Sequence, residues 1–517
     1  YLFKRVLFSA PFFIFGLMKV FVRKSICSFL FCCCIFFSAY ADKVYNFDAT
    51  CQQAYNEITS LRLANGEKLI VQARQQNPDN LIPDLLDSYI DFFILFFNED
   101  PAELKIRKPH FDDYFDKLGD GPDSSPFYNY CRSVVLIQEA CVEIKFGQHW
   151  SAGWDFRKAF SLIKDNKRKF PSFVPNNMIY GPMQVVAGTI PDGYKWLAGL
   201  FGIKGSISNG MALMQNVLNS NDAYARLFSA EAIFYYCYIT FYIENQPEQV
   251  FQLINQKKLD LVNNHLMAYM AANLAINNKM DEFARSIIQN RNNSAAYMQT
   301  PIWNFEMAYI QLRHLELADA TKNFEYFLSH FKGKFYVKDA CEKLGWCYYL
   351  QGNINAANNA RQMVLKRGST ETDADKQAYT DAKTGVWPNP ILLKARVLND
   401  GGYNEQAIAL LEGKTANDFN NATDKLEFTY RVGRIYDDLG KDDAAIKNYV
   451  AAISLGENRT EYYASRAALQ IGLIYEKQGR KDLAIQYYKK CLAMQDHDYK
   501  DSIDQKAKSG IARCSGE

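Results

Sequence analysis

An all-α fold is predicted for this chain: a superhelical array of antiparallel helix hairpins, in other words an α-solenoid. Two observations predict it. The last third of the sequence repeats itself at a constant offset of 39 residues, and the apolar–polar alternation of β-strands is nearly absent. Six positions match: Gly433, Tyr436, Gly440, Ala445, Tyr449 and Ala452 recur as Gly472, Tyr475, Gly479, Ala484, Tyr488 and Cys491.

Each repeated unit has the pattern of two packed helices. Gly433 and Tyr436 share one face of the first helix, and Gly440 ends it with the left-handed backbone that a helix C-terminus favours. Ala445 and Tyr449 form the packing stripe of the second helix. The unit resembles the tetratricopeptide repeat, which implies a partner-binding protein more often than an enzyme.

The same template extends toward the N-terminus at irregular spacing. We expect four further units, which become weaker upstream: Leu344, Gly345, Tyr348, Gly352 and Ala357; Ala395, Leu398, Gly402, Ala407 and Leu411; Ala308, Ala320, Phe324 and Phe327; Ala272, Ala275, Ala284 and Ile288. A 50-residue gap between Gly345 and Ala395 contains the polar run 368–376. That run predicts a surface loop or a helix extension, followed by a turn at 386–390.

The first 41 residues have the pattern of an export signal. Lys19, Arg23 and Lys24 form a basic segment, residues 25–37 are apolar, and Ala39-Tyr40-Ala41 is a small-x-small cleavage site. A membrane anchor is the alternative, but the apolar run is shorter than a helical span needs. We expect residues 1–41 to be an upstream extension plus a signal peptide cleaved after Ala41, and the mature protein to be periplasmic or outer-membrane-associated.

Composition limits the remaining classes of function. The whole chain carries a formal charge of +2, and residues 1–41 hold five bases and no acid, so the mature chain is near −3. That balance argues against nucleic acid as a partner. Aromatic residues are dense in 88–97 and 230–242, in runs too short to span a bilayer. They predict helical core, with lipid contact as the alternative, and no transmembrane span in the mature chain.

Neither a catalytic site nor a metal or cofactor site is predicted. The six histidines are scattered, and the sequence lacks zinc-binding, phosphate-loop, dinucleotide and nucleophile-elbow motifs. The eight cysteines after residue 41 permit disulfides in an exported protein, and Cys491 could face Cys514. The protein is therefore expected not to be an enzyme; residues 171–210, where prolines and glycines break the helical rhythm, are where an unforeseen active site would lie.

That irregular segment carries a second resemblance. Gly202, Ile203, Gly205, Gly210 and Met211 are spaced as in the tetratricopeptide repeat protein 39 / inclusion-body clearance family, with Ser206 in place of an acid as a helix cap. The segments Pro301-Ile302-Trp303 and Leu344-Gly345-Trp346 are also similar to that family. The resemblance implies a helical-repeat fold without enzymatic activity, and links to lipid homeostasis and to clearance of protein inclusions.

The expected function is that of an exported, non-enzymatic scaffold that binds a protein or peptide, as part of an envelope or outer-membrane complex. Handling of a lipid or apolar ligand is the alternative. We expect an N-terminal helical domain at 42–260 and a repeat array at 261–517, with a concave groove along the first helices. The residues expected to line it are Trp346, Tyr349, Arg396, Asn399, Tyr430, Arg434, Asp437, Arg466 and Glu476.

Overall fold

The computed structural model describes residues 42–189 and 203–515, and within them the predicted all-α fold is confirmed. The β-pairing in these residues is an isolated bridge between Val44 and Asn80. Both the expected signal segment and residues 190–202 of the irregular segment, including Gly202, lie outside the described residues.

The N-terminal helices are α1 (Ala49–Thr59), α2 (Leu63–Gln76), α3 (Ile82–Asn98), α4 (Pro101–Lys117), α5 (Phe127–Lys145), α6 (His149–Lys169), α7 (Pro175–Gly188), α9 (Ile207–Leu218), α10 (Ala223–Leu227), α11 (Ser229–Tyr242), α12 (Pro247–Lys257), α13 (His265–Asn277) and α14 (Asp281–Asn290). In the described ranges, no helix is both long and apolar enough to cross a membrane.

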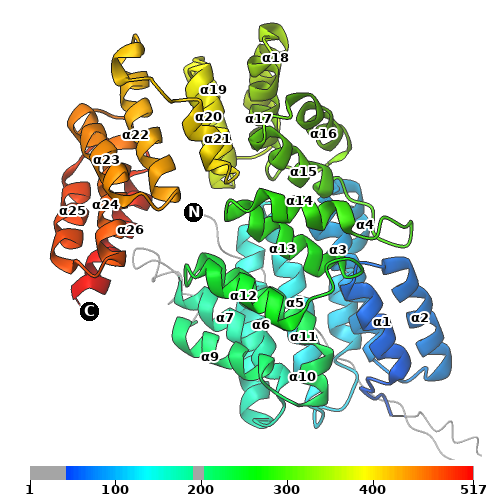
Figure 1. Ribbon diagram of the computed structural model, residues 1–517. Coiled ribbons are helices and arrows are strands. Elements are labelled where there is room, and N and C mark those ends of the chain that lie inside the picture. The colour runs from blue at the N-terminus through cyan, green and yellow to red at the C-terminus, as the bar shows by residue number, and fades with distance from the viewer. Residues whose placement is uncertain (1–41, 190–202, 516–517) are drawn as a thin grey trace, which may run out of the picture. The chain divides into compact units, whose positions relative to one another are not determined.

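The remaining helices are α15 (Ile302–Arg313), α16 (Leu317–His330), α17 (Val337–Leu350), α18 (Ile354–Lys366), α19 (Asp373–Thr384), α20 (Pro390–Asp400), α21 (Asn404–Ala409), the short 3₁₀ turn η2 (Ala416–Asp418), α22 (Ala422–Asp438), α23 (Asp442–Gly456), α24 (Tyr463–Lys477), α25 (Lys481–Ala493) and α26 (Lys500–Ser515). Most follow one another as packed hairpins, such as α17 with α18 and α24 with α25 (Figure 1).

The two matched repeats pack in the predicted way. A Cβ on Gly433 would lie 2.7 Å from the ring of Tyr449, and one on Gly472 would lie 2.4 Å from the ring of Tyr488, so each tyrosine fills the space that a glycine leaves. Gly440 and Gly479 have φ of +69° and +76°, the left-handed conformation that ends the first helix of each hairpin.

The polar run 368–376 forms neither a simple loop nor an extension of α18. α18 ends at Lys366, and a separate helix, α19, begins at Asp373 after Thr372 caps its first turn. Asp375 is fully buried and accepts hydrogen bonds from the backbone N–H groups of Tyr336, Lys338 and Asp339 at 2.8–3.1 Å. Asp375, which lies in the run expected on the surface, therefore caps the start of α17. Its carboxylate satisfies the free N–H groups of that helix N-terminus.

The irregular segment brings two helices unusually close together. A Cβ on Gly210 of α9 would lie 2.5 Å from the carbonyl oxygen of Gly181 on α7, so glycine is needed at this crossing. Ser206 accepts a hydrogen bond from Asn209 N–H and caps α9, as predicted. Gly210 and Ser206, two of the residues that carry the family resemblance, thus have structural roles.

The hydrophobic core differs along the chain. One continuous cluster extends from Phe47 in the N-terminal segment to Ile310 on α15, past the expected boundary at residue 260. Beyond it, three smaller clusters lie between successive hairpins. The eight cysteines in the described ranges, Cys491 and Cys514 among them, are free thiols.

Candidate partner-binding groove

Two adjoining hollows lie along the first helices of the array. The arginine hollow, of about 460 Å³, is lined mainly by α19, α20, α22, α24 and α26. The tryptophan hollow, of about 550 Å³, is lined mainly by α17, α19, α22 and the linker 386–389. They share the lining residues Asp381, Arg396, Thr423 and Tyr463, so together they form one groove.

Four arginines from three successive first helices line the arginine hollow: Arg396 on α20, Arg431 and Arg434 on α22, and Arg466 on α24. Arg431 is 5% exposed and pairs with Glu427 at 3.0 Å through Nε. Its Nη2 is buried without a hydrogen-bond partner. A guanidinium has five N–H donors, and a buried donor without an acceptor is costly, so Arg431 has unused capacity for an anionic group.

The other three arginines differ in how strongly they are paired. Arg434 lies 3.5 Å from Asp437 and 3.6 Å from Asp438, and Arg396 lies 3.7 Å from Asp400. Arg466 has no ion pair within the part of the chain that the structure describes. Charge-assisted hydrogen bonds are strongest at 2.7–2.9 Å. These longer contacts therefore leave part of the positive charge available to a ligand.

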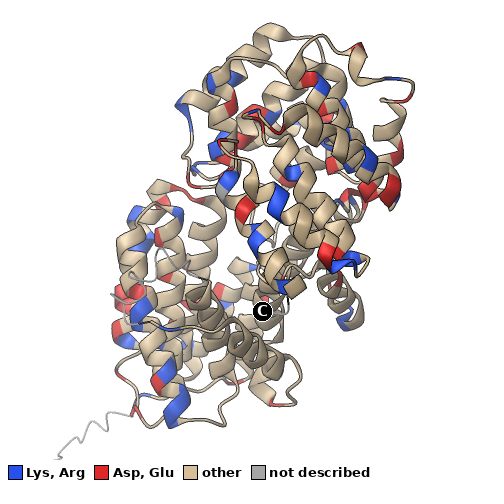
Figure 2. Cartoon of the chain, turned by 90° about the vertical axis from the view of Figure 1, so that its left-hand side faces the viewer, with Lys and Arg blue, Asp and Glu red and all other residues tan. Residues whose placement is uncertain are grey.

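Acidic residues face the same hollow from its other helices. Partial burial, and then the nearby carboxylates of Asp381 and Glu461, raise the pKa of Asp498. The charge of Glu461 is partly balanced, because Arg459 donates to its carboxylate at 2.5 Å and Thr423 Oγ1 donates at 2.8 Å. On the helices drawn in Figure 2, basic and acidic residues are interspersed. Recognition in the arginine hollow therefore depends on these local groups.

Aromatic rings form the walls between the charges. Tyr430 lies 5.2 Å from Tyr463 between ring centroids, and Tyr462 meets Tyr499 edge-on at 5.2 Å. In the tryptophan hollow, Tyr349 stacks on Trp387 at 4.9 Å and 12°, and Arg361 lies over Trp387 at 3.8 Å. Such rings give a ligand large apolar contact area beside the charged groups.

The nine residues predicted for the groove divide into two groups. Six line the hollows: Trp346, Tyr349, Arg396, Tyr430, Arg434 and Arg466. Three do not, and each is hydrogen-bonded inside the array. Asn399 donates to Asn404 and Asp438, Asp437 accepts from Tyr449 and Gln470, and Glu476 pairs with Arg513 at 2.7 Å.

Several lining residues were not predicted: Asp381, Trp387, Arg431, Tyr462, Tyr463 and Tyr499. The sequence could have indicated three of them, because Tyr462, Tyr463 and Tyr499 lie at or just before the start of α24 or α26, where successive units begin. No sequence pattern indicated Trp387. It belongs to a linker that folds back onto α17, where its ring stacks on Tyr349.

Comparison with known families identifies the repeated part. The tetratricopeptide repeat family model matches residues 426–458 and 465–498, which cover α22–α23 and α24–α25. The chain therefore contains tetratricopeptide repeats. No curated protein matches the chain significantly.

Solved structures with some similarity to the chain include three assemblies or domains. The P58(IPK) TPR domain has 15% identity over 80% of this chain and 95% of its own, with a TM-score of 0.23. The APC/C hetero-tetramer Cut9–Hcn1 has 11% identity over 90% and 99%, with a TM-score of 0.29. Naa15/Naa10 bound to HypK-THB has 12% identity over 90% and 78%, with a TM-score of 0.22. These TM-scores are too low to support the fold. The all-α repeat fold is therefore assigned from the helices of this chain and from its tetratricopeptide repeats.

Proposed function

We propose that this protein is a non-enzymatic scaffold that binds an extended segment of a protein partner in the groove. The observation that carries the proposal is the convergence of four arginines, one with a buried unpaired N–H, on an aromatic-walled hollow. Tetratricopeptide repeats in the same helices support a protein-binding role.

The chemistry of the groove favours a segment with an acidic side chain. A carboxylate can accept hydrogen bonds from Arg431 and Arg466, since guanidinium groups match its two-oxygen geometry. The carboxylates of Asp381 and Asp498 can accept N–H groups of the same segment. Tyrosine and tryptophan rings supply apolar contact on either side, a combination typical of binding hot spots.

Site-specific cross-linking in the native cell tests the location. A photoreactive residue in place of Tyr462, in the arginine hollow, should capture a partner, whereas one in place of Val450 should not. Val450 is a suitable control because it lies on the outer helix α23 and is 41% exposed. Capture of a partner from position 450 but not from position 462 would contradict the proposed binding in the groove.

Binding of the captured segment as a synthetic peptide then tests the chemistry. Arg466→Ala should weaken binding about tenfold or more, because a hydrogen bond to a charged group contributes about 1.5–3 kcal/mol. Arg168→Ala, at an arginine 83% exposed on α6, should leave binding unchanged. Replacing the peptide's acidic residues by their amides should weaken binding to wild type much more than to Arg466→Ala. Equal affinity of acid and amide peptides would contradict the proposed chemistry.

Export of the protein is a separate proposal. It is supported by the basic segment, the apolar run and the small-x-small site before Asp42. N-terminal sequencing of the native protein should find Asp42 as the first residue, in a periplasmic or outer-membrane fraction. A protein that retains residues 18–41 in a cytosolic fraction would contradict it.

Lipid handling has weaker support from the structure. Rings of each aromatic run pack within the fold: Phe93 and Phe97 are 4% and 3% exposed, and Phe234 packs on Tyr238 with 4.8 Å between ring centroids. Core packing therefore accounts for most of these rings, whereas Tyr242 at the end of α11 is 52% exposed. Mass spectrometry of the purified native protein would detect a retained lipid.

A further inference from the structure

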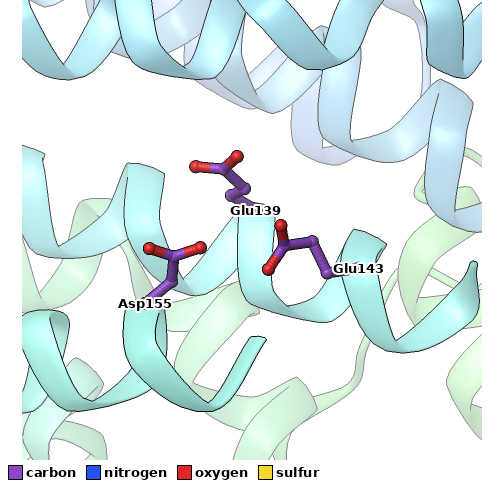
Figure 3. Close-up of side chains that lie close together, drawn as sticks. All are labelled: Glu139, Glu143 and Asp155. Carbon is purple, nitrogen blue, oxygen red and sulfur yellow. The ribbon is translucent and has the colours of Figure 1, made fainter. Parts of the chain in front are cut away.

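Three carboxylates converge between α5 and α6, far along the chain from the groove. Glu139 and Glu143 are one helical turn apart on α5, and Asp155 comes from α6 (Figure 3). In Figure 3 the carboxylates of Glu143 and Asp155 face each other and that of Glu139 lies above them, and one oxygen from each lies within 4.8 Å of the others. Glu139 and Glu143 are only 7% and 1% exposed.

The cluster has less positive charge than its carboxylates require. Lys108 on α4 donates to Oε1 of Glu139 at 3.2 Å and to Oε1 of Glu143 at 2.5 Å. A single ammonium thus faces three carboxylates. Oε2 of Glu143 is buried and has no hydrogen-bond partner. The neighbouring carboxyl of Asp155 can donate to Glu143 only when it is protonated. When Asp155 is ionised, a buried carboxylate oxygen without a donor is costly, so this oxygen points to a bound group that supplies positive charge.

We propose that Glu139, Glu143 and Asp155 bind a divalent cation that prefers oxygen ligands, namely calcium. The donor set is made only of carboxylate oxygens, which hard cations select. Lys108 uses the Oε1 atoms and leaves Oε2 of Glu143 for the ion. Three carboxylates and one ammonium leave two negative charges, which a divalent ion neutralises.

The spacing of the oxygens favours calcium over magnesium. Three atoms that are no more than 4.8 Å apart all lie within roughly 2.8 Å of a common point. Calcium binds oxygen at about 2.3–2.6 Å with flexible geometry, whereas magnesium requires about 2.0–2.1 Å in a near-ideal octahedron. A small inward shift of the side chains therefore suffices for calcium, and water can complete its coordination.

A proton is the competitor for this position. Burial, and then the charges of Glu139 and Glu143, raise the pKa of Asp155 to about 7, so near neutral pH a proton competes with a cation for this carboxylate. Burial also raises the pKa of Glu139, against the opposing effect of Lys108, and Asp112 on α4 adds further negative charge nearby.

Bound calcium would join α5 to α6 in the N-terminal region.

The test is calcium binding by the purified full chain, after treatment with a chelator and measured at pH 7.5. Calorimetric titration with calcium chloride should show saturable binding, and Tm should rise by about 2 °C or more at saturation. Glu143→Gln and Asp155→Asn should each abolish both effects. Asp165→Asn is the matched control, since Asp165 lies on the same helix, is 52% exposed and pairs with Arg168.

A fourth variant separates ion binding from loss of folding. Lys108→Met removes the neighbouring positive charge and should tighten calcium binding about tenfold, whatever it does to the Tm of the calcium-free protein. Absence of saturable binding by wild type would overturn the proposal and leave a proton as the neutralising charge. Binding that survives both Glu143→Gln and Asp155→Asn, or that Asp165→Asn abolishes, would overturn it as well. Since the cluster is separate from the groove, failure here leaves the proposed partner binding unaffected.

Discussion

The N-terminal helices and the repeat array handle buried polar groups in different ways. In the N-terminal region, Glu231 is sealed in the continuous core and accepts hydrogen bonds from three phenols, those of Tyr55, Tyr89 and Tyr235, at 2.7–2.8 Å. In the array, the cores lie between hairpins, and charged residues gather along a groove. The phenols satisfy Glu231 inside the core, whereas the stacked hairpins of the array leave one face free for a ligand.

The largest expected effect concerns the sealed carboxylate. Glu231→Ala leaves three buried hydroxyl groups without their acceptor and should lower the free energy of unfolding by about 3–5 kcal/mol, as measured by urea denaturation. Glu67→Ala, at an exposed position on α2, should change it by no more than about 0.5 kcal/mol. Equal losses in the two variants would show that Glu231 has no special role in the N-terminal core.

A pH-dependent effect is expected where the two regions meet. α15 contributes Ile310 to the N-terminal core and Leu312 to the next, and its Glu306 is 3% exposed. Burial raises the pKa of Glu306 to about 7, although Asn273 donates to its carboxylate at 2.9 Å. Because the folded-state pKa is raised, the associated stability is fully present below about pH 4.5 and is lost as pH rises through about 7.

Glu306→Gln should therefore remove a decline of roughly 3 kcal/mol in unfolding free energy between pH 4.5 and 8. The measurement is the difference between wild type and variant in urea titrations at several pH values, which cancels the contribution of other titrating groups. If the difference in unfolding free energy between wild type and Glu306→Gln did not change with pH, the decline would arise from a group other than Glu306.

A smaller, local effect is expected in the array. Gly472→Ala places a Cβ 2.4 Å from the Tyr488 ring and should cost about 1–3 kcal/mol, because α24 and α25 must move apart. Hydrogen exchange should become faster in α24–α26 and stay unchanged in α1–α6, since repeats interact mainly with their neighbours. Lys447→Ala, exposed on α23, is the control. Faster exchange throughout the chain would mean that the two regions unfold as one unit.

The smallest effect on stability is expected in the groove. Arg466→Ala should change the unfolding free energy by no more than about 0.5 kcal/mol, because Arg466 has no ion pair in the described ranges. The same variant should impair binding of the partner segment, as argued above. A large loss of stability would show that Arg466 supports the fold rather than a ligand.

The sequence by itself determined the class of fold and the internal geometry of the repeats. Glycine and tyrosine at a constant offset specify how each hairpin closes, because the contacts between Gly433 and Tyr449 are local in the chain. It also indicated six of the groove-lining residues, since a helical period places them beside the packing stripe.

Only the tertiary structure decided which polar residues face the groove and which are used inside. Asp437 and Arg434 are one turn apart on α22, yet Tyr449 and Gln470 engage Asp437, while Arg434 lines the hollow. The carboxylate cluster likewise depends on how α4, α5 and α6 pack, because Asp155 and Lys108 come from helices on either side of Glu139 and Glu143 in sequence. A side chain's partners lie on other helices, and the helical period alone does not say which helix is its neighbour.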